Sequence, residues 1–98
     1  MAAGLTLHWT PLATEHLRAA YEYVAQDSAP AAEALIERIF GAVEMLALYP
    51  GIGRSGRVKG TRELVIAGTP FLVAYRVRGN KLEVLAVLHG ARRWPPEF

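Results

Sequence analysis

The residues best suited to chemistry in this chain of 98 residues are arginines and one histidine in its second half. Arg62, Arg76 and Arg78 lie in strand-like segments, and His89 lies near the end of the last of them. A guanidinium group binds phosphate bidentately, and an imidazole exchanges a proton near neutral pH. Arg62, Arg76 and His89, gathered on one open sheet face, would match a metal-independent ribonuclease, in which cations hold the scissile phosphate and a base activates the 2′-hydroxyl.

Two of these residues also have a structural interpretation. Arg76 faces Glu83 in the predicted hairpin, so a cross-strand ion pair is the favoured role for this arginine. A histidine at the end of a strand more commonly serves as a structural hydrogen-bonding residue than as a catalyst. A structural role is therefore an alternative for His89. Both interpretations stay open beside the catalytic one.

The charge of the chain is divided between its two halves. Residues 51–98 hold nine Arg or Lys against three Asp or Glu, whereas residues 1–50 hold two against six. Clustered cations predict contact with a nucleic acid or an acidic protein. The candidate target-binding residues are Arg54, Arg57, Lys59, Arg78, Arg92, Arg93 and Trp94.

Several other classes of site are not indicated. The three histidines, His8, His16 and His89, lack metal-ligand spacing, and the chain contains no cysteine. The glycine-rich segment 51–60 lacks the Gly-Lys-Ser/Thr ending of a phosphate-binding loop. We therefore expect no metal and no cofactor. No stretch reaches the ~18 apolar residues of a membrane span, and no secretory signal opens the sequence, so we expect a cytoplasmic protein without membrane contact.

The helices and strands that must position these residues follow from hydrophobic periodicity and from the capping, proline and glycine residues that end each segment. Residues 5–9 alternate as a short strand, Thr10 and Pro11 open a helix to about residue 27, and a second helix follows from about 30 to 49. Strands are predicted at roughly 61–66, 71–78 and 81–89, after a basic connector. The expected fold is α+β in the order β-α-α-β-β-β: one domain, residues 1–98, with a helix hairpin packed on a curled antiparallel sheet and a short tail at 92–98.

The Gly79-Asn80 turn predicts the register of the last hairpin. It pairs Arg78 with Lys81 and Arg76 with Glu83, and, continued without interruption, Ala74 with Leu85. One face then carries Phe71, Val73, Tyr75, Val77, Leu82, Val84, Ala86 and Leu88, which we expect to pack on the helices. Arg76, Arg78, Glu83 and His89 fall on the open face.

In this order the chain resembles the RelE/ParE superfamily of toxins from bacterial type II toxin–antitoxin modules. The resemblance covers nearly the whole chain. It is carried by residues 9–13 (WTPLA), 45–54 (MLALYPGIGR), 60–64 (GTREL), 70–77 (PFLVAYRV) and 84–92 (VLAVLHGAR).

The resemblance implies a toxin neutralised in a hetero-oligomer by a cognate antitoxin, for which Tyr23 and Phe98 are candidate contacts. Members similar to ParE inhibit DNA gyrase without catalysis of their own, and the GTREL and LHGAR segments favour this side. Members similar to RelE cut mRNA on the ribosome, and Arg62, Arg76 and His89 would be the catalytic candidates. A third interpretation is a co-repressor that reaches operator DNA only through its antitoxin.

Overall fold

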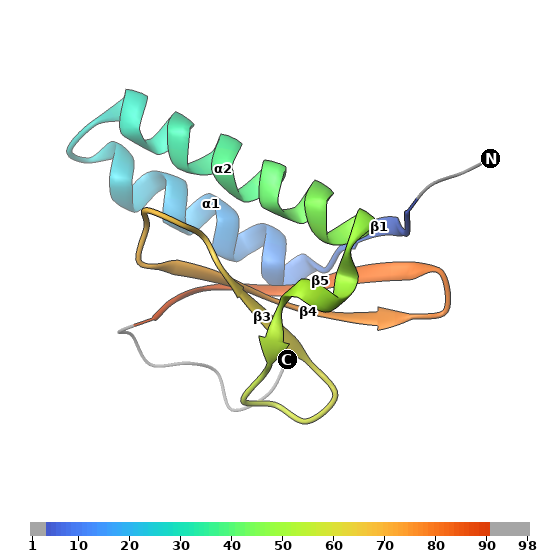
Figure 1. The fold of residues 1–98 in the computed structure, drawn as a ribbon. Helices are drawn as coiled ribbons and strands as arrows, with labels where there is room; N and C mark the ends of the chain where they lie inside the picture. The colour runs from blue at the N-terminus through green and yellow to red at the C-terminus, as the bar shows by residue number, and fades with distance from the viewer. Residues whose placement is uncertain (1–3, 91–98) are drawn as a thin grey trace.

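The structure, a computed structural model, describes residues 4–90 and places two helices over one face of a five-stranded sheet (Figure 1). The expected α+β fold is confirmed. The elements are β1 (Thr6–Trp9), α1 (Pro11–Ala25), α2 (Ala29–Leu48), the 3-10 turn η1 (Pro50–Ile52), β2 (Arg54–Ser55), β3 (Arg62–Val65), β4 (Phe71–Arg78) and β5 (Lys81–His89).

Both helices begin where the sequence places a capping residue before a proline. The hydroxyl of Thr10 accepts a hydrogen bond from the Ala13 amide at the start of α1, and Ser28 does the same for Ala31 at the start of α2. Each cap satisfies an amide that the first helical turn leaves without a partner. Within residues 4–90, neither helix is long and apolar enough to cross a membrane.

The strand order of the sheet is β1-β5-β4-β3-β2. Strand β1 does not pair with β2, the next strand in sequence. It adds to the edge of β5 in parallel, with Trp9 opposite Val84, so the sheet contains both parallel and antiparallel pairs. The remaining pairs are antiparallel. The two-residue strand β2 lies inside the segment that the sequence predicts as a connector, and it pairs with the start of β3.

The predicted β4–β5 register is confirmed near the turn and wrong beyond it. Arg78 pairs with Lys81 and Arg76 with Glu83, but the register shifts between Ala74 and Tyr75, so that Ala74 pairs with Ala86 instead of Leu85. A bulge places one extra residue on β5, and every later side chain of that strand moves to the opposite face. The same shift pairs Leu72 with Leu88 and Phe71 with His89.

The bulge also redistributes the apolar side chains between the two faces of the sheet. The cluster that includes the helices contains Phe71, Val73, Tyr75, Leu82, Val84 and Val87 from the sheet. A second buried cluster consists of Leu72, Ala74, Ala86 and Leu88. Ala86 and Leu88, expected on the helix-packed face, therefore lie on the other one. Val77 lies on the expected face, but 44% of it is exposed.

Helix α1 covers the edge of β5 beyond the last residue of β1. The Thr10 hydroxyl lies 2.9 Å from the Val84 carbonyl oxygen, and Nδ1 of His16 accepts a hydrogen bond from the Val87 amide at 3.2 Å. Burial lowers the pKa of His16, although the neighbouring Glu15 carboxylate opposes the shift. An unpaired strand edge is thus closed by side chains of a helix rather than by another strand.

Candidate functional site

Arg62 does not lie on the same face of the sheet as Arg76. It pairs with Tyr75 across β3 and β4, which places it on the face that carries the helices and η1, and its guanidinium donates to the Gly53 carbonyl at 2.7 Å. The expectation of one open face shared by these arginines is wrong, because side chains alternate along β4 and Tyr75 and Arg76 are adjacent.

Arg76 lies at the other face, in the ion pair that the sequence predicts. Its Nε is 2.6 Å from Oε1 of Glu83, and Arg78 Nη1 lies 3.9 Å from the same oxygen. The hydrogen bond from Arg76 lowers the pKa of Glu83. Desolvation by burial opposes this shift, and the charges of Arg76, Arg78 and His8 lower the pKa further.

His89 lies far from both arginines. It pairs with Phe71 at the opposite end of β4, and the two rings meet edge to face with centroids 5.4 Å apart. Arg76 lies five residue steps along β4 from Phe71, which corresponds to about 17 Å. The bulge turns His89 toward the helix side, so the expectation that it shares the open face with Arg76, Arg78 and Glu83 is also wrong. Arg62, Arg76 and His89 form no common centre.

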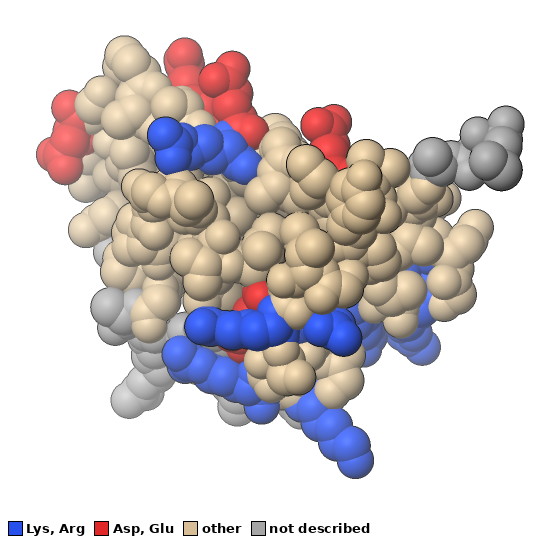
Figure 2. Space-filling model, viewed as in Figure 1, with Lys and Arg blue, Asp and Glu red and all other residues tan. Residues whose placement is uncertain are grey.

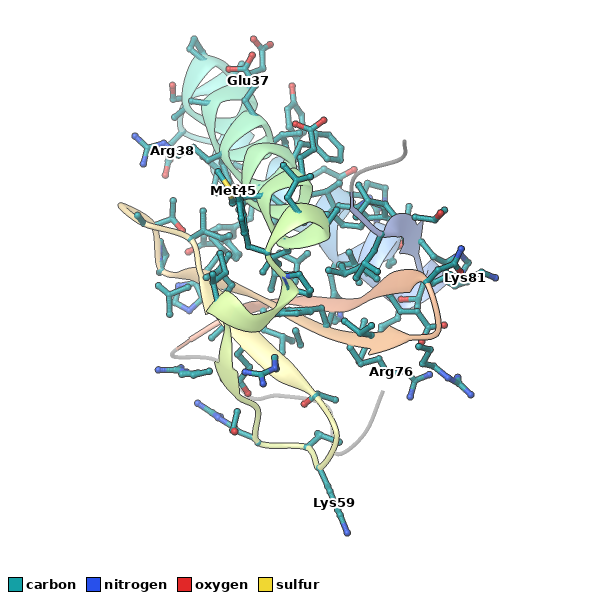
Figure 3. All side chains as sticks on the ribbon, turned by 45° about the vertical axis from the view of Figure 1, so that its right-hand side comes forward. Glu37, Arg38, Met45, Lys59, Arg76 and Lys81 are labelled. Atoms are coloured by element: carbon teal, nitrogen blue, oxygen red, sulfur yellow. The ribbon has the colours of Figure 1, made fainter. Side chains whose placement is uncertain are left out.

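The segment between η1 and β3 is an ordered basic hairpin, which we call the cationic hairpin (residues 54–61). Its cations are Arg54, Arg57 and Lys59, all exposed, and Lys59 projects from its tip (Figure 3). Backbone bonds from Gly56 to the Thr61 carbonyl and from Thr61 to the Val58 carbonyl close the hairpin. In the view of Figure 2, acidic side chains lie over the helices and basic ones gather over the lower part of the sheet and this hairpin.

A buried carboxylate holds the cationic hairpin in place. Glu63 is only 3% exposed, and it accepts a hydrogen bond from the Arg57 amide at 2.8 Å. Nη2 of Arg54 lies 3.4 Å from the same carboxylate. A buried charge is tolerated only when it is paired and hydrogen-bonded, so Glu63 couples the core of the sheet to the position of the cations.

Tyr75 is a second positioning residue, and the sequence gives it no distinction from other strand aromatics. Its side chain is fully buried, and its hydroxyl accepts from the Gly53 amide at 2.9 Å and donates to the Pro50 carbonyl at 2.7 Å. Burial raises its pKa, which the bond from Gly53 and the charge of Arg62 partly oppose. Tyr75 therefore fixes η1 on the sheet as a neutral hydrogen-bonding group.

Apolar side chains are exposed along α2, η1 and β3. They include Met45, Leu48, Tyr49, Ile52 and Val65, each about half exposed or more. A hollow of about 390 Å³ lies between α2 and the end of β3, lined by Arg38, Gly41, Ala42, Met45, Leu64, Val65, Ile66 and Ala67. Arg38 stands at this hollow and donates to the Ala67 carbonyl at 2.8 Å. We call this surface the α2–β3 groove.

The remaining candidates divide into those that the structure places and those that it does not describe. Tyr23 is 52% exposed and lines a hollow of about 220 Å³ with Leu35, Phe71 and His89 among others. Arg92, Arg93, Trp94 and Phe98 lie outside the described residues. Within the described part of the chain, no group of three or more His, Cys, Asp or Glu side chains is arranged to hold a metal ion.

Comparisons of the sequence with known proteins agree on one protein family. The family model described as "ParE toxin of type II toxin-antitoxin system, parDE" matches residues 7–94. The chain is 40% identical over 89 residues to "Putative toxin Y4kP" of Sinorhizobium fredii, covering 91% of this chain and 92% of the relative. It is 33% identical over 84 residues to "Toxin RelE2" of Caulobacter vibrioides, covering 86% and 93%.

A solved structure agrees with these sequences. The fold superimposes with a TM-score of 0.77 on a chain of "Chromosomal ParDE TA system from P. aeruginosa", at 29% sequence identity, covering 88% of this chain and 96% of the other. The similarity thus extends over most of both chains.

Proposed function

This chain belongs to the ParE family of toxins of type II toxin–antitoxin systems, and from that premise we propose that it arrests growth by inhibiting DNA gyrase until a cognate antitoxin neutralises it. Gyrase as the target is what the likeness to ParE implies. The proposed site of action is the cytoplasm, where gyrase and its DNA are found.

One observation supports a toxin that acts by binding its target rather than by cleaving RNA. Arg62 and Arg76 lie on opposite faces of the sheet, and His89 pairs with the far end of β4. A general base must come within hydrogen-bond reach of the proton that it removes, directly or through one water. Phe71, the partner of His89, lies about 17 Å along β4 from Arg76, and the side chains of His89 and Arg76 point to opposite faces of the sheet, so they do not meet at one scissile phosphate.

The cationic hairpin is the proposed target contact. Arg54, Arg57 and Lys59 are exposed, and Glu63 fixes the loop that carries them. A preordered loop loses less conformational entropy on binding than a mobile one. Arg78 is the fourth described residue proposed for target binding.

The α2–β3 groove is the proposed antitoxin contact in a hetero-oligomer of the two proteins. Its lining includes Gly41 and Ala42, and nothing lies within 4 Å of the position that a Cβ would take on Gly41. A helix or extended segment can therefore approach α2 closely. Exposed Met45 and Val65 offer apolar contact, and the guanidinium of Arg38 favours an acidic residue in the partner. Tyr23 stays a proposed contact at the other end of the helix pair.

Purified, antitoxin-free protein mixed with DNA gyrase and relaxed plasmid tests the proposal. We expect a dose-dependent loss of supercoiling with accumulation of cleaved DNA, reversed by the antitoxin. The double variant Arg62→Ala/His89→Ala, checked for an intact fold by circular dichroism, should inhibit like the parent protein. No effect of a folded protein on gyrase, together with cleavage of ribosome-bound mRNA that the double variant loses, would replace this proposal with the ribonuclease.

A further inference from the structure

One end of the sheet carries a cluster of cations that the proposed target and antitoxin contacts do not fully use. On the face away from the helices, His8, Glu83 and Arg76 are neighbours across β1, β5 and β4, and Lys81 and Arg78 are neighbours in the next row. Figure 3 shows Arg76 and Lys81 at this end of the sheet. We call these five residues the hairpin corner.

The single carboxylate of the hairpin corner orients arginines rather than neutralising the cluster. Glu83 is bound to Arg76 at 2.6 Å and lies 3.9 Å from Arg78, yet the side chains of these arginines stay 40% and 65% exposed. Glu83 is the sole acidic residue of β1, β4 and β5, so three permanent cations face one anion. An arginine held on one side by a carboxylate presents its other N–H donors in a fixed direction.

The pairing of Arg78 with Lys81 is unfavourable for the fold alone. The two cations lie directly opposite each other beside the Gly79-Asn80 turn. Like charges in this position destabilise an antiparallel pair. An anion bound between the two cations would remove that repulsion, which explains why two cations can lie opposite each other here.

The chemistry of the neighbouring surface favours a polynucleotide over a protein as the source of that anion. The exposed apolar residues adjacent in sequence to the hairpin corner are Leu7 and Val77. Both pair with Leu82 and therefore point to the helix side of the sheet, away from the corner. The buried core of a protein interface is more apolar than its rim, whereas phosphate binding requires only clustered cations. We propose that the hairpin corner binds phosphate groups of a nucleic-acid backbone without reading sequence, through Arg76, Arg78, Lys81 and His8.

Fluorescence anisotropy of a labelled DNA duplex of random sequence, with toxin alone, tests this site between about 50 and 200 mM salt. In Arg78→Gln/Lys81→Gln we expect weaker binding and a slope of log K against log salt that is shallower by about 0.9 for each phosphate that the variant no longer neutralises. The melting temperature of this variant should equal or exceed that of the parent, because the like-charge pair is gone. Arg18→Gln, which removes an exposed arginine of α1, is the matched control and should change the slope little.

Two results would overturn the inference. One is a double variant whose affinity and salt slope equal those of the parent or of Arg18→Gln. The other is poly-L-glutamate that displaces the duplex as well as unlabelled DNA does at equal charge, which would assign the corner to an acidic protein. Since the assay contains neither gyrase nor antitoxin, its outcome is separate from that of the proposed function.

Discussion

The Tyr75 hydroxyl accepts a hydrogen bond from the Gly53 amide at 2.9 Å and joins the end of α2, through η1, to the middle of the sheet. Gly53 has no room for a side chain, because a Cβ there would overlap that hydroxyl and lie 2.9 Å from the Glu63 carbonyl oxygen. Two residues from distant elements therefore constrain each other, one by its hydroxyl and the other by its lack of a side chain.

Tyr75→Phe should lower the free energy of unfolding by about 1–3 kcal/mol, since it leaves the buried Gly53 amide without its acceptor. Urea denaturation followed by circular dichroism measures the change. An unchanged midpoint would mean that water replaces the hydroxyl at no cost.

Gly53→Ala should destabilise the fold more than Tyr75→Phe does, because the new methyl group meets both the hydroxyl and the backbone of β3. Combining the two substitutions should be less damaging than the sum of the single effects, since removing the hydroxyl relieves the closest of the three contacts that the new methyl group makes with Tyr75 and with the Glu63 carbonyl oxygen. Gly51→Ala is the matched control, with nothing within 4 Å of the new Cβ. Strict additivity of the two substitutions would contradict the contact.

His16 should make stability fall at acid pH. Its folded-state pKa is depressed, chiefly by burial, so the unfolded chain binds the proton more readily and folding is opposed as pH falls below the ordinary histidine pKa of about 6.5. The contribution is fully present above that pH. Comparing melting temperatures at pH 8 and pH 5, His16→Gln should lose less stability than the parent protein, because a glutamine oxygen accepts the Val87 amide without titrating.

Glu63→Ala should release the cationic hairpin without unfolding the sheet. The Arg57 amide then loses its carboxylate acceptor, and its hydrogen exchange should become faster by about tenfold or more, given a net value of about 1.5–3 kcal/mol for a hydrogen bond to a charged group. Gyrase inhibition should weaken in parallel. Glu37→Ala, an exposed site on α2, serves as the control. If a Glu63→Ala protein with a mobile cationic hairpin still inhibits gyrase fully, the cationic hairpin does not contact the target.

Met45→Glu should weaken antitoxin binding by about tenfold or more, which corresponds to the loss of about 1.4 kcal/mol at an interface anchor. Met45 is 48% exposed, so the substitution should leave the monomer folded. Titration calorimetry with the cognate antitoxin measures the effect, and Leu12→Glu on α1 is the comparison. Equal affinity of the Met45→Glu and parent proteins would move the antitoxin contact away from the α2–β3 groove.

The sequence by itself determined the two helices and the four longer strands of this protein. Thr10-Pro11 and Ser28-Ala29-Pro30 cap helices by local chemistry, and the Gly79-Asn80 turn sets the pairing of Arg76 with Glu83 within a few residues. These features depend on neighbours along the chain, so periodicity and capping suffice to predict them. The division of charge between the two halves also survives folding, because the acidic half forms the helices.

Only the tertiary structure decided which side chains share a face. The bulge on β5 lies where β1 ends and α1 begins to cover the strand edge, a junction between segments some 75 residues apart that no local pattern encodes. It moves His89 away from Arg76, and the pairing of Arg62 with Tyr75 separates the two arginines. A shift of one residue reverses every later side chain of β5, and neighbouring residues of β4 point to opposite faces, so the three residues of the candidate ribonuclease centre lie in three separate places.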